Sequence, residues 1–168
     1  MKKKNTMSVL VENRFGVLSR VSGLFSGRGY NIDSLTVTAT QDPEVSKMTI
    51  VTHGSENVLE QINKQLHKLI DVIAVVDLSF EDFVEREVLL IKVKVDRSNR
   101  ADVIQIAEIF DAKIVSVNKG EIGFEVTGRS DKIDDFIAML KLEGYEIIDL
   151  ACSGIVAIAR KPGAIARY

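Results

Sequence analysis

The chain has 168 residues, a length that suits one medium domain or two small ones. Its composition, with 46% hydrophobic and 27% charged residues, is ordinary for a globular protein, and the net charge of −2 gives no basic surface for nucleic acid. No apolar stretch approaches the roughly 20 residues of a membrane span, and the single cysteine, Cys152, cannot form an internal disulfide. We therefore expect a cytoplasmic protein without membrane or nucleic-acid partners.

In the first half of the chain, the spacing of apolar residues predicts elements in the order strand, helix, strand, strand, helix, strand. Apolar residues alternate in the expected strands and recur every three or four residues in the expected helices. Gly27 and Gly29 could both end the first helix, because glycine readily adopts the left-handed conformation that ends helices, and Gly29 is the better terminator of the two. The expected elements are a strand over 7–11, a helix over about 17–28, strands over 34–40 and 47–53, a helix over 57–70 and a strand over 71–80.

The second half repeats this order, although the residues themselves hardly repeat. Its expected elements are a strand over 88–95, a helix over 99–110, strands over 114–117 and 122–126, a helix over 131–142 and a last strand from Gly144 through Leu150. A short acidic segment, 81–85, connects the halves. In each half the helices should cover one face of an antiparallel sheet. We therefore expect an α+β protein of two tandem ferredoxin-like βαββαβ domains, 1–80 and 81–168.

The chain lacks the residue patterns of an enzyme active site. His53 and His67 have no Cys, His or carboxylate partner at metal-ligand spacing, so ordinary surface or edge histidines are expected. Cys152 has no nearby base in the sequence and is interpreted as a packing thiol. Neither a dinucleotide-binding glycine motif nor a phosphate-binding loop is present. We expect no catalytic residue, no metal site and no cofactor held by this chain.

The most informative segment joins the first strand to the first helix, at Asn13-Arg14-Phe15-Gly16-Val17-Leu18. A glycine there lets a ligand approach the backbone closely, and the free N–H groups of a helix start favour an anion such as a carboxylate. A second segment, Gly29 to Leu35, begins where that helix ends, so Asn31 is expected to lie close to a neighbouring turn. Together the two segments are expected to clasp a small amino acid.

Each of these residues also has an ordinary structural interpretation. Asn13 and Asn31 are common turn formers, because asparagine tolerates unusual backbone angles. Thr36, Thr38 and Thr40 of the second strand are typical of the water-facing side of a sheet. The second half has no equivalent of the glycine turn, so we assign sensing to the first half.

These segments resemble the ACT domain, a family of small-molecule sensor modules, and more closely the small, regulatory subunits of acetolactate synthase (acetohydroxyacid synthase). The resemblance spans nearly the whole chain and is most specific in residues 7–90. The matching segments are Leu18-Ser19-Arg20-Val21, Leu24-Phe25-Ser26, Arg28-Gly29-Tyr30-Asn31-Ile32, Ser34-Leu35-Thr36-Val37, Met48-Thr49-Ile50, 59–69, Val84-Glu85-Arg86-Glu87, Ser153-Gly154-Ile155-Val156 and Arg160.

The resemblance implies that the first domain pairs with its counterpart in a homodimer and binds an effector at that junction. One chain would hold the carboxylate of the effector and the paired chain its ammonium. The residues implied are Asn13 and the backbone amides of Gly16, Val17 and Leu18 for the carboxylate, and Asn31 and Ile32 for the ammonium. One departure is Phe15, since many ACT domains have proline there, which would stiffen the turn.

The resemblance also implies a partner and a role. This chain would activate a separate catalytic (large) subunit that uses thiamine diphosphate, magnesium and FAD to form acetolactate from pyruvate. Valine or a related branched-chain amino acid would act through it as a feedback inhibitor of branched-chain amino-acid biosynthesis. Three other interpretations stay open: a sensor of another enzyme or transporter, a nucleic-acid regulator, which the acidic balance disfavours, and a purely structural dimerisation module.

Overall fold

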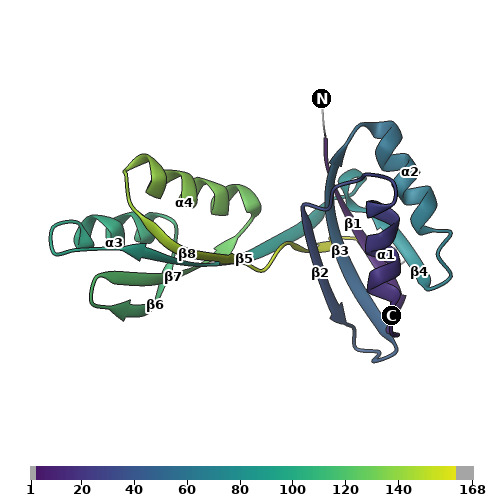
Figure 1. The fold of residues 1–168 in the computed structure, drawn as a ribbon, viewed down its shortest axis with the longest axis horizontal. Helices are drawn as coiled ribbons and strands as arrows, with labels where there is room; N and C mark the ends of the chain where they lie inside the picture. The colour runs from purple at the N-terminus through teal and green to yellow at the C-terminus, as the bar shows by residue number, and fades with distance from the viewer. Residues whose placement is uncertain (1–2, 162–168) are drawn as a thin grey trace. The chain divides into compact units, whose positions relative to one another are not determined.

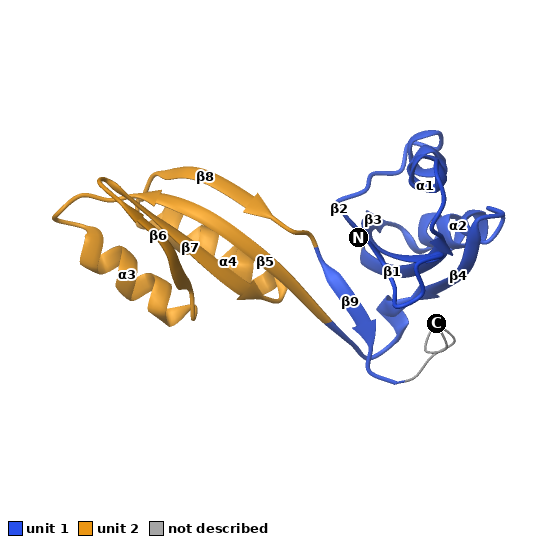
Figure 2. Cartoon of the chain, turned by 90° about the horizontal axis from the view of Figure 1, so that it is seen from below, with its two compact units in different colours: residues 1–84, 155–168 blue, residues 85–154 orange. Residues whose placement is uncertain are grey.

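The structure has two compact units, and the first is built from two separate parts of the sequence. The computed structural model describes residues 3–161. Of these, residues 3–84 and 155–161 form the first unit, and residues 85–154 form the second (Figure 2). The division expected from the sequence placed the final segment with the second half. Within that segment, residues 162–168 lie outside the described part, and residues 155–161 belong to the first unit because apolar side chains among them are buried there.

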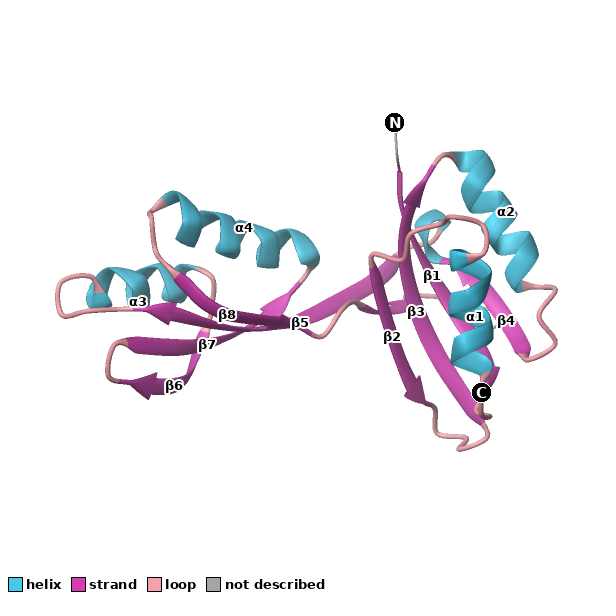
Figure 3. Ribbon diagram, in the orientation of Figure 1, coloured by secondary structure: helices cyan, strands magenta, loops and turns pink. Residues whose placement is uncertain are grey.

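The first unit is a four-stranded antiparallel sheet with two helices on one face (Figures 1 and 3). Its elements are β1 (Lys3–Glu12), α1 (Val17–Ser26), β2 (Ser34–Ala39), β3 (Val45–Gly54), α2 (Glu56–Leu66) and β4 (Val72–Asp77). The strand order is β2-β3-β1-β4, so β2 and β4 are the edges. The predicted order of elements is confirmed, although β1 begins four residues earlier and α2 ends four residues earlier than expected.

The helices of the first unit form because their apolar residues share one face, which is buried against the sheet. Phe25 of α1 and Ile62 and Leu66 of α2 are at most 1% exposed and pack with alternate residues of β1 and β3. The end of α1 is as predicted: Gly29 has a φ of 69°, and the N–H of Tyr30 donates to the Phe25 carbonyl at 2.9 Å. This closure directs the chain from α1 toward the start of β2.

The opposite face of the first sheet is covered as well, which the sequence did not indicate. Val51 of β3 follows Ile50, whose side chain packs in the core beneath the helices, and is nevertheless only 2% exposed on the other face. The cover consists of a short 3-10 helix, η1 (Leu78–Phe80), and the strand β9 (Val156–Ala159) with the residue before it. The buried members of this second cluster are Val51, Leu78, Ile155 and Ala157.

Two expectations in this region were wrong. The strand expected over 71–80 ends at Asp77, whose carboxylate accepts the N–H of Ser79 and so starts η1. The hydroxyl of Thr36, expected to face water, donates to the carbonyl of Ile155 at 2.7 Å. The N–H of Ile155 in turn donates to the hydroxyl of Ser34 at 3.1 Å, so β2 holds the returning segment from two alternate positions.

The second unit repeats the arrangement with its own core. Its elements are β5 (Phe83–Lys94), α3 (Arg100–Ile109), β6 (Lys113–Asn118), β7 (Glu121–Gly128), α4 (Ser130–Leu142) and β8 (Ile147–Cys152). The strand order is β6-β7-β5-β8, and β9 also pairs with β5. The expected connection over 81–85 is wrong in part, because β5 already begins at Phe83. The predicted α+β class with two βαββαβ halves is confirmed.

Candidate functional site

The turn between β1 and α1 has the backbone that the glycine predicts. Gly16 is the residue that precedes α1, and its φ of 83° is left-handed, a conformation that other residues adopt with strain. No side chain caps the start of α1, and its first turn holds no acidic residue. The N–H groups at the start of α1 are therefore not capped by a side chain, and their partial positive charge can attract an anion.

Asn13 anchors this turn to the loop between β2 and β3. Its N–H donates to the carbonyl of Glu44 at 2.7 Å, and its side-chain Nδ2 donates to the carbonyl of Pro43 at 2.8 Å. These bonds match the turn-forming interpretation of Asn13. Because a primary amide carries two N–H hydrogens, the bond to Pro43 leaves one for a ligand.

A fixed positive charge lies beside the same turn. Arg20, one helical turn into α1, has its Nε 2.6 Å from the buried carboxylate of Asp71. The hydrogen bond to Asp71 raises the pKa of Arg20 above its ordinary value. A Cβ on Gly16 would lie 3.1 Å from Nη1 of Arg20. Asp71 is more than 50 positions from Arg20 in the chain and is brought beside it only by the fold.

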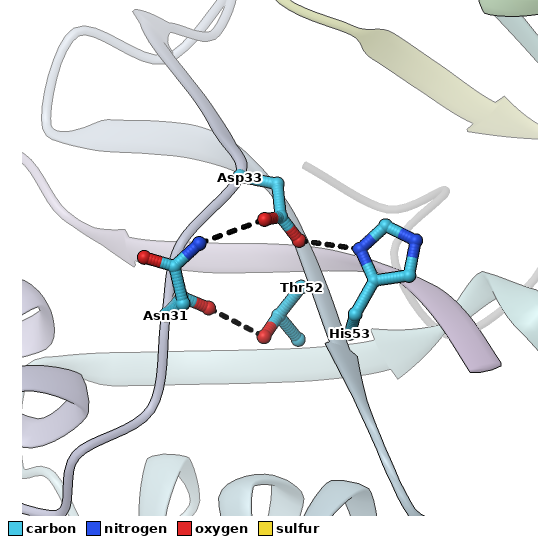
Figure 4. A network of polar contacts seen from close by, with 4 residues as sticks. All are labelled: Asn31, Asp33, Thr52 and His53. Atoms are coloured by element: carbon cyan, nitrogen blue, oxygen red, sulfur yellow. Dashed lines mark hydrogen bonds and ion pairs between the residues drawn. The ribbon is translucent and has the colours of Figure 1, made fainter. Parts of the chain in front are cut away.

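Asn31 lies in a polar network at the start of β2 (Figure 4). Its Nδ2 donates to Oδ1 of Asp33 at 2.7 Å, and its carbonyl accepts the hydroxyl hydrogen of Thr52 at 2.6 Å. The second carboxylate oxygen of Asp33 is 2.6 Å from Nδ1 of His53. Sequence reasoning missed Asp33 and Thr52 and took His53 for an isolated histidine, because the contact depends on β3 lying next to the segment that enters β2.

A cleft of about 580 Å³ opens beside this network. Its size is within the range of small-molecule sites. The lining residues are Arg28, Gly29, Tyr30, Asn31, His53, Gly54, Ser55 and Val58. The cleft thus combines a cation, polar groups and an apolar wall.

The structure does not bring the two predicted segments together within one chain. Thr52, which holds Asn31, pairs with Asn5 near the start of β1, whereas the glycine turn follows Glu12 at the other end of that strand. The seven residue steps between Asn5 and Glu12 span roughly 23 Å. The expectation that Asn31 lies close to the turn therefore does not hold inside a single chain.

The remaining predicted residues flank these two places. Val17 is 2% exposed, so its side chain belongs to the core and only its backbone faces the turn. Leu18 is 46% exposed at the start of α1. Ile32 is partly buried and packs against the core beside Asn31.

Among residues 3–161 no group of three or more His, Cys, Asp or Glu side chains is placed to hold a metal ion. In the same part of the chain, no helix is both long and apolar enough to cross a membrane.

Comparisons with known proteins decide the family. Residues 7–74 match the AHAS small subunit-like ACT domain, and residues 86–161 match the family of the small subunit of acetolactate synthase. The acetolactate synthase isozyme 3 small subunit of Salmonella typhimurium is 48% identical over 94% of this chain and 96% of its own length. The chain belongs to the acetolactate synthase small-subunit family. The resemblance stated from the sequence is therefore confirmed.

Other members of the small-subunit family match over nearly the same span. The acetolactate synthase small subunit of Buchnera aphidicola is 46% identical over 94% of this chain and 99% of its own. The crystal structure of the small subunit from Thermotoga maritima superposes with a TM-score of 0.84 at 36% identity, covering 96% of this chain and 99% of that one. The small-subunit fold thus includes both halves.

Proposed function

We propose that this chain is the non-catalytic regulatory subunit of acetolactate synthase. In this proposal it activates a thiamine-diphosphate-dependent catalytic subunit in the cytoplasm and confers feedback inhibition by valine or a related branched-chain amino acid. The observation that supports it most directly is the similarity to named small subunits along almost the entire chain, at 48% identity over 94% of its length. The ACT-domain match over residues 7–74 supports an effector site in the first unit.

The free edge of β2 offers a way to complete that site from two chains. β2 is an edge strand, and an unpaired edge is a template for another strand. The Asn31 network lies at the beginning of β2, and Ala39 at its end pairs with Ser46, on the side of the sheet where Asn13 contacts the β2–β3 loop. Antiparallel pairing of two β2 strands about a two-fold axis would place the Asn31 end of one chain beside the glycine-turn end of the other.

The glycine-turn end and the Asn31 end suit opposite charges, as a zwitterion requires. At the glycine turn, the uncapped start of α1 and the guanidinium of Arg20 suit a carboxylate, and a helix start stabilises an anion by roughly 0.3–1 kcal/mol. The second N–H of Asn13 and the amides of Gly16, Val17 and Leu18 would be the donors. At the other end an ammonium would meet acceptor oxygens, so both ligand charges would be paired, as burial demands.

The ammonium end would be formed by the side-chain oxygen of Asn31 and the main-chain carbonyl of Ile32. One N–H of the Asn31 amide donates to Asp33, and its Oδ1 is available as the acceptor. A branched aliphatic side chain would then lie among apolar residues between the paired units. One methylene is worth only about 1–3 kcal/mol in such a pocket, so discrimination among valine, leucine and isoleucine is a fine balance.

Regulation would follow if effector and catalytic subunit prefer different arrangements of the paired first units. A coupling free energy of about 1–3 kcal/mol is typical of such linkage and changes affinity about 5- to 150-fold. The cofactors would all belong to the catalytic subunit, and this chain would hold none of them.

The test is acetolactate formation by the catalytic subunit from the same organism, with and without this chain and with valine added to each. We expect the chain to raise the rate and valine to reverse the increase only when the chain is present. An unchanged rate with folded chain in excess would contradict the proposal and favour a sensor of another partner.

A further inference from the structure

The carboxylate of Asp33 determines which way the amide of Asn31 faces. A carboxylate only accepts hydrogen bonds, so the group of Asn31 that lies 2.7 Å from Oδ1 of Asp33 is the amide nitrogen. The amide oxygen consequently points to the other side (Figure 4). An oxygen in that position accepts a hydrogen bond from an ammonium but repels a carboxylate.

Asn31 and Asp33 each make further hydrogen bonds, which fix this orientation of the amide. The carbonyl of Asn31 accepts the hydroxyl of Thr52 at 2.6 Å, and the N–H of Asp33 donates to the carbonyl of Val51 at 2.8 Å. The second oxygen of Asp33 contacts Nδ1 of His53 at 2.6 Å. With its backbone and both carboxylate oxygens engaged, Asp33 cannot rotate without breaking several bonds at once.

Asp33 also places a negative charge next to the cleft that Asn31 and His53 line. Its side chain is 34% exposed, which leaves its charge only partly screened by water. A cationic group bound at Oδ1 of Asn31 would be attracted by this charge, and a neutral group would not. The positive neighbour on the lining is Arg28, whose Nη2 donates to Gln65 at 3.0 Å.

We propose that Asp33 is the positioning residue that makes the effector site select an α-amino group, by orienting the Asn31 amide and by supplying negative charge for the ammonium. This inference rests on the proposed function, since it assumes that Asn31 contacts the effector. Its consequence is selectivity by chemical class: the site accepts a 2-amino acid and rejects the 2-hydroxy acid with the same carboxylate and side chain.

The test compares two ligands on the full-length chain by calorimetric titration. The ligands are L-valine and (S)-2-hydroxy-3-methylbutanoate, which differ only in the group at carbon 2. The proteins are the wild type, Asp33→Asn, Asp33→Ser, Asp33→Glu and the control Asp135→Asn, which removes an exposed carboxylate from α4 of the second unit. Thermal denaturation without ligand establishes that each variant is folded, and Asp33→Ser replaces Asp33→Asn if the latter is not.

We expect the preference for valine over the hydroxy acid to be about tenfold lower in the neutral variants, Asp33→Asn and Asp33→Ser, than in the wild type. A factor of about ten is the scale of a hydrogen bond that involves a charged group. Asp33→Glu should restore part of that preference, and Asp135→Asn should leave it unchanged. If the neutral variants weaken both ligands by the same factor, Asp33 has only a structural role and the inference fails. If the wild-type chain binds neither ligand, the proposed function fails with it, and the two failures are thus distinguishable.

Discussion

At the scale of single residues, the glycine turn is the place where one added side chain should change the response most. Gly16 has a left-handed φ of 83°, and the space where a Cβ would lie faces Nη1 of Arg20 at 3.1 Å. The same space borders the uncapped helix start that the proposed function gives to the effector carboxylate.

We predict that Gly16→Asp lowers the affinity for valine by about tenfold or more, because it places a like charge where the ligand's carboxylate binds. The backbone strain should cost about 1 kcal/mol of stability and leave the chain folded. Calorimetric titration and thermal denaturation measure the two effects. Gly144→Asp is the matched control, since Gly144 has a φ of 79° and no atom within 4 Å of the added Cβ. Equal valine affinity in Gly16→Asp and wild type would exclude the turn from the site.

Desolvation and a neighbouring negative charge both raise the pKa of Cys152. The thiol is exposed on β8, and its pKa is raised first by desolvation and then by the negative charge of Glu87. A raised pKa means less thiolate at neutral pH, and the thiolate is the reactive form.

We predict that Glu87→Gln speeds alkylation of Cys152 by iodoacetamide severalfold at neutral pH, because removing the charge lowers the pKa of the thiol. In both proteins the rate should rise with pH. Glu56→Gln, on α2 of the first unit, is the control and should alkylate like the wild type. An unchanged rate in Glu87→Gln would mean that Glu87 does not raise the pKa of the thiol.

At the scale of elements, the two strand-to-helix turns differ in what fills them. In the first unit no side chain caps the start of α1, and its first turn holds no acidic residue. In the second unit the carboxylate of Asp96 accepts the N–H and hydroxyl of Ser98, at 2.7 and 2.6 Å, and the N–H of Asn99 at 3.1 Å. The second turn thus supplies its own anion, a physical reason to place sensing in the first unit only.

These hydrogen bonds lower the pKa of Asp96, the side-chain bond from Ser98 contributing most. A lowered folded-state pKa stabilises the fold above the pKa of the unfolded chain, and that stability is lost as pH falls through the folded-state value. We predict that Asp96→Asn lowers the melting temperature at neutral pH and that the difference from wild type shrinks on acidification. Thermal denaturation across the acid range measures it, with Asp135→Asn as the control. A difference that does not depend on pH would contradict this account.

At the scale of the whole molecule, the second unit is inserted between two parts of the first. Residues before 85 and residues from 155 onward share one cluster, in which Ile155 is 4% exposed and packs with Val51 and Leu78. The backbone of Ile155 is also held by Ser34 and Thr36 of β2. The first unit is therefore incomplete without residues 155–159.

We predict that Ile155→Ala destabilises the protein by about 2–4 kcal/mol, the usual cost of truncating a buried isoleucine. Ile158→Ala, three residues later and 59% exposed, should change the free energy of unfolding by less than about 0.5 kcal/mol. Urea denaturation followed by circular dichroism measures both. Similar values for the two variants would show that the returning segment does not stabilise the first unit.

The sequence by itself determined the two βαββαβ halves, because strand and helix periodicities record which residues face a core, and glycines such as Gly16 and Gly29 record left-handed turns. Only the tertiary structure decided where residues 155–161 belong, which partners Arg20 and Asn31 have, and that Asn31 and the glycine turn lie at opposite ends of β1. Such facts depend on strand register and chain return, which join Asp71 to Arg20 and Ile155 to Thr36 across long stretches of sequence. Local periodicity is set by neighbours along the chain and carries no record of these contacts.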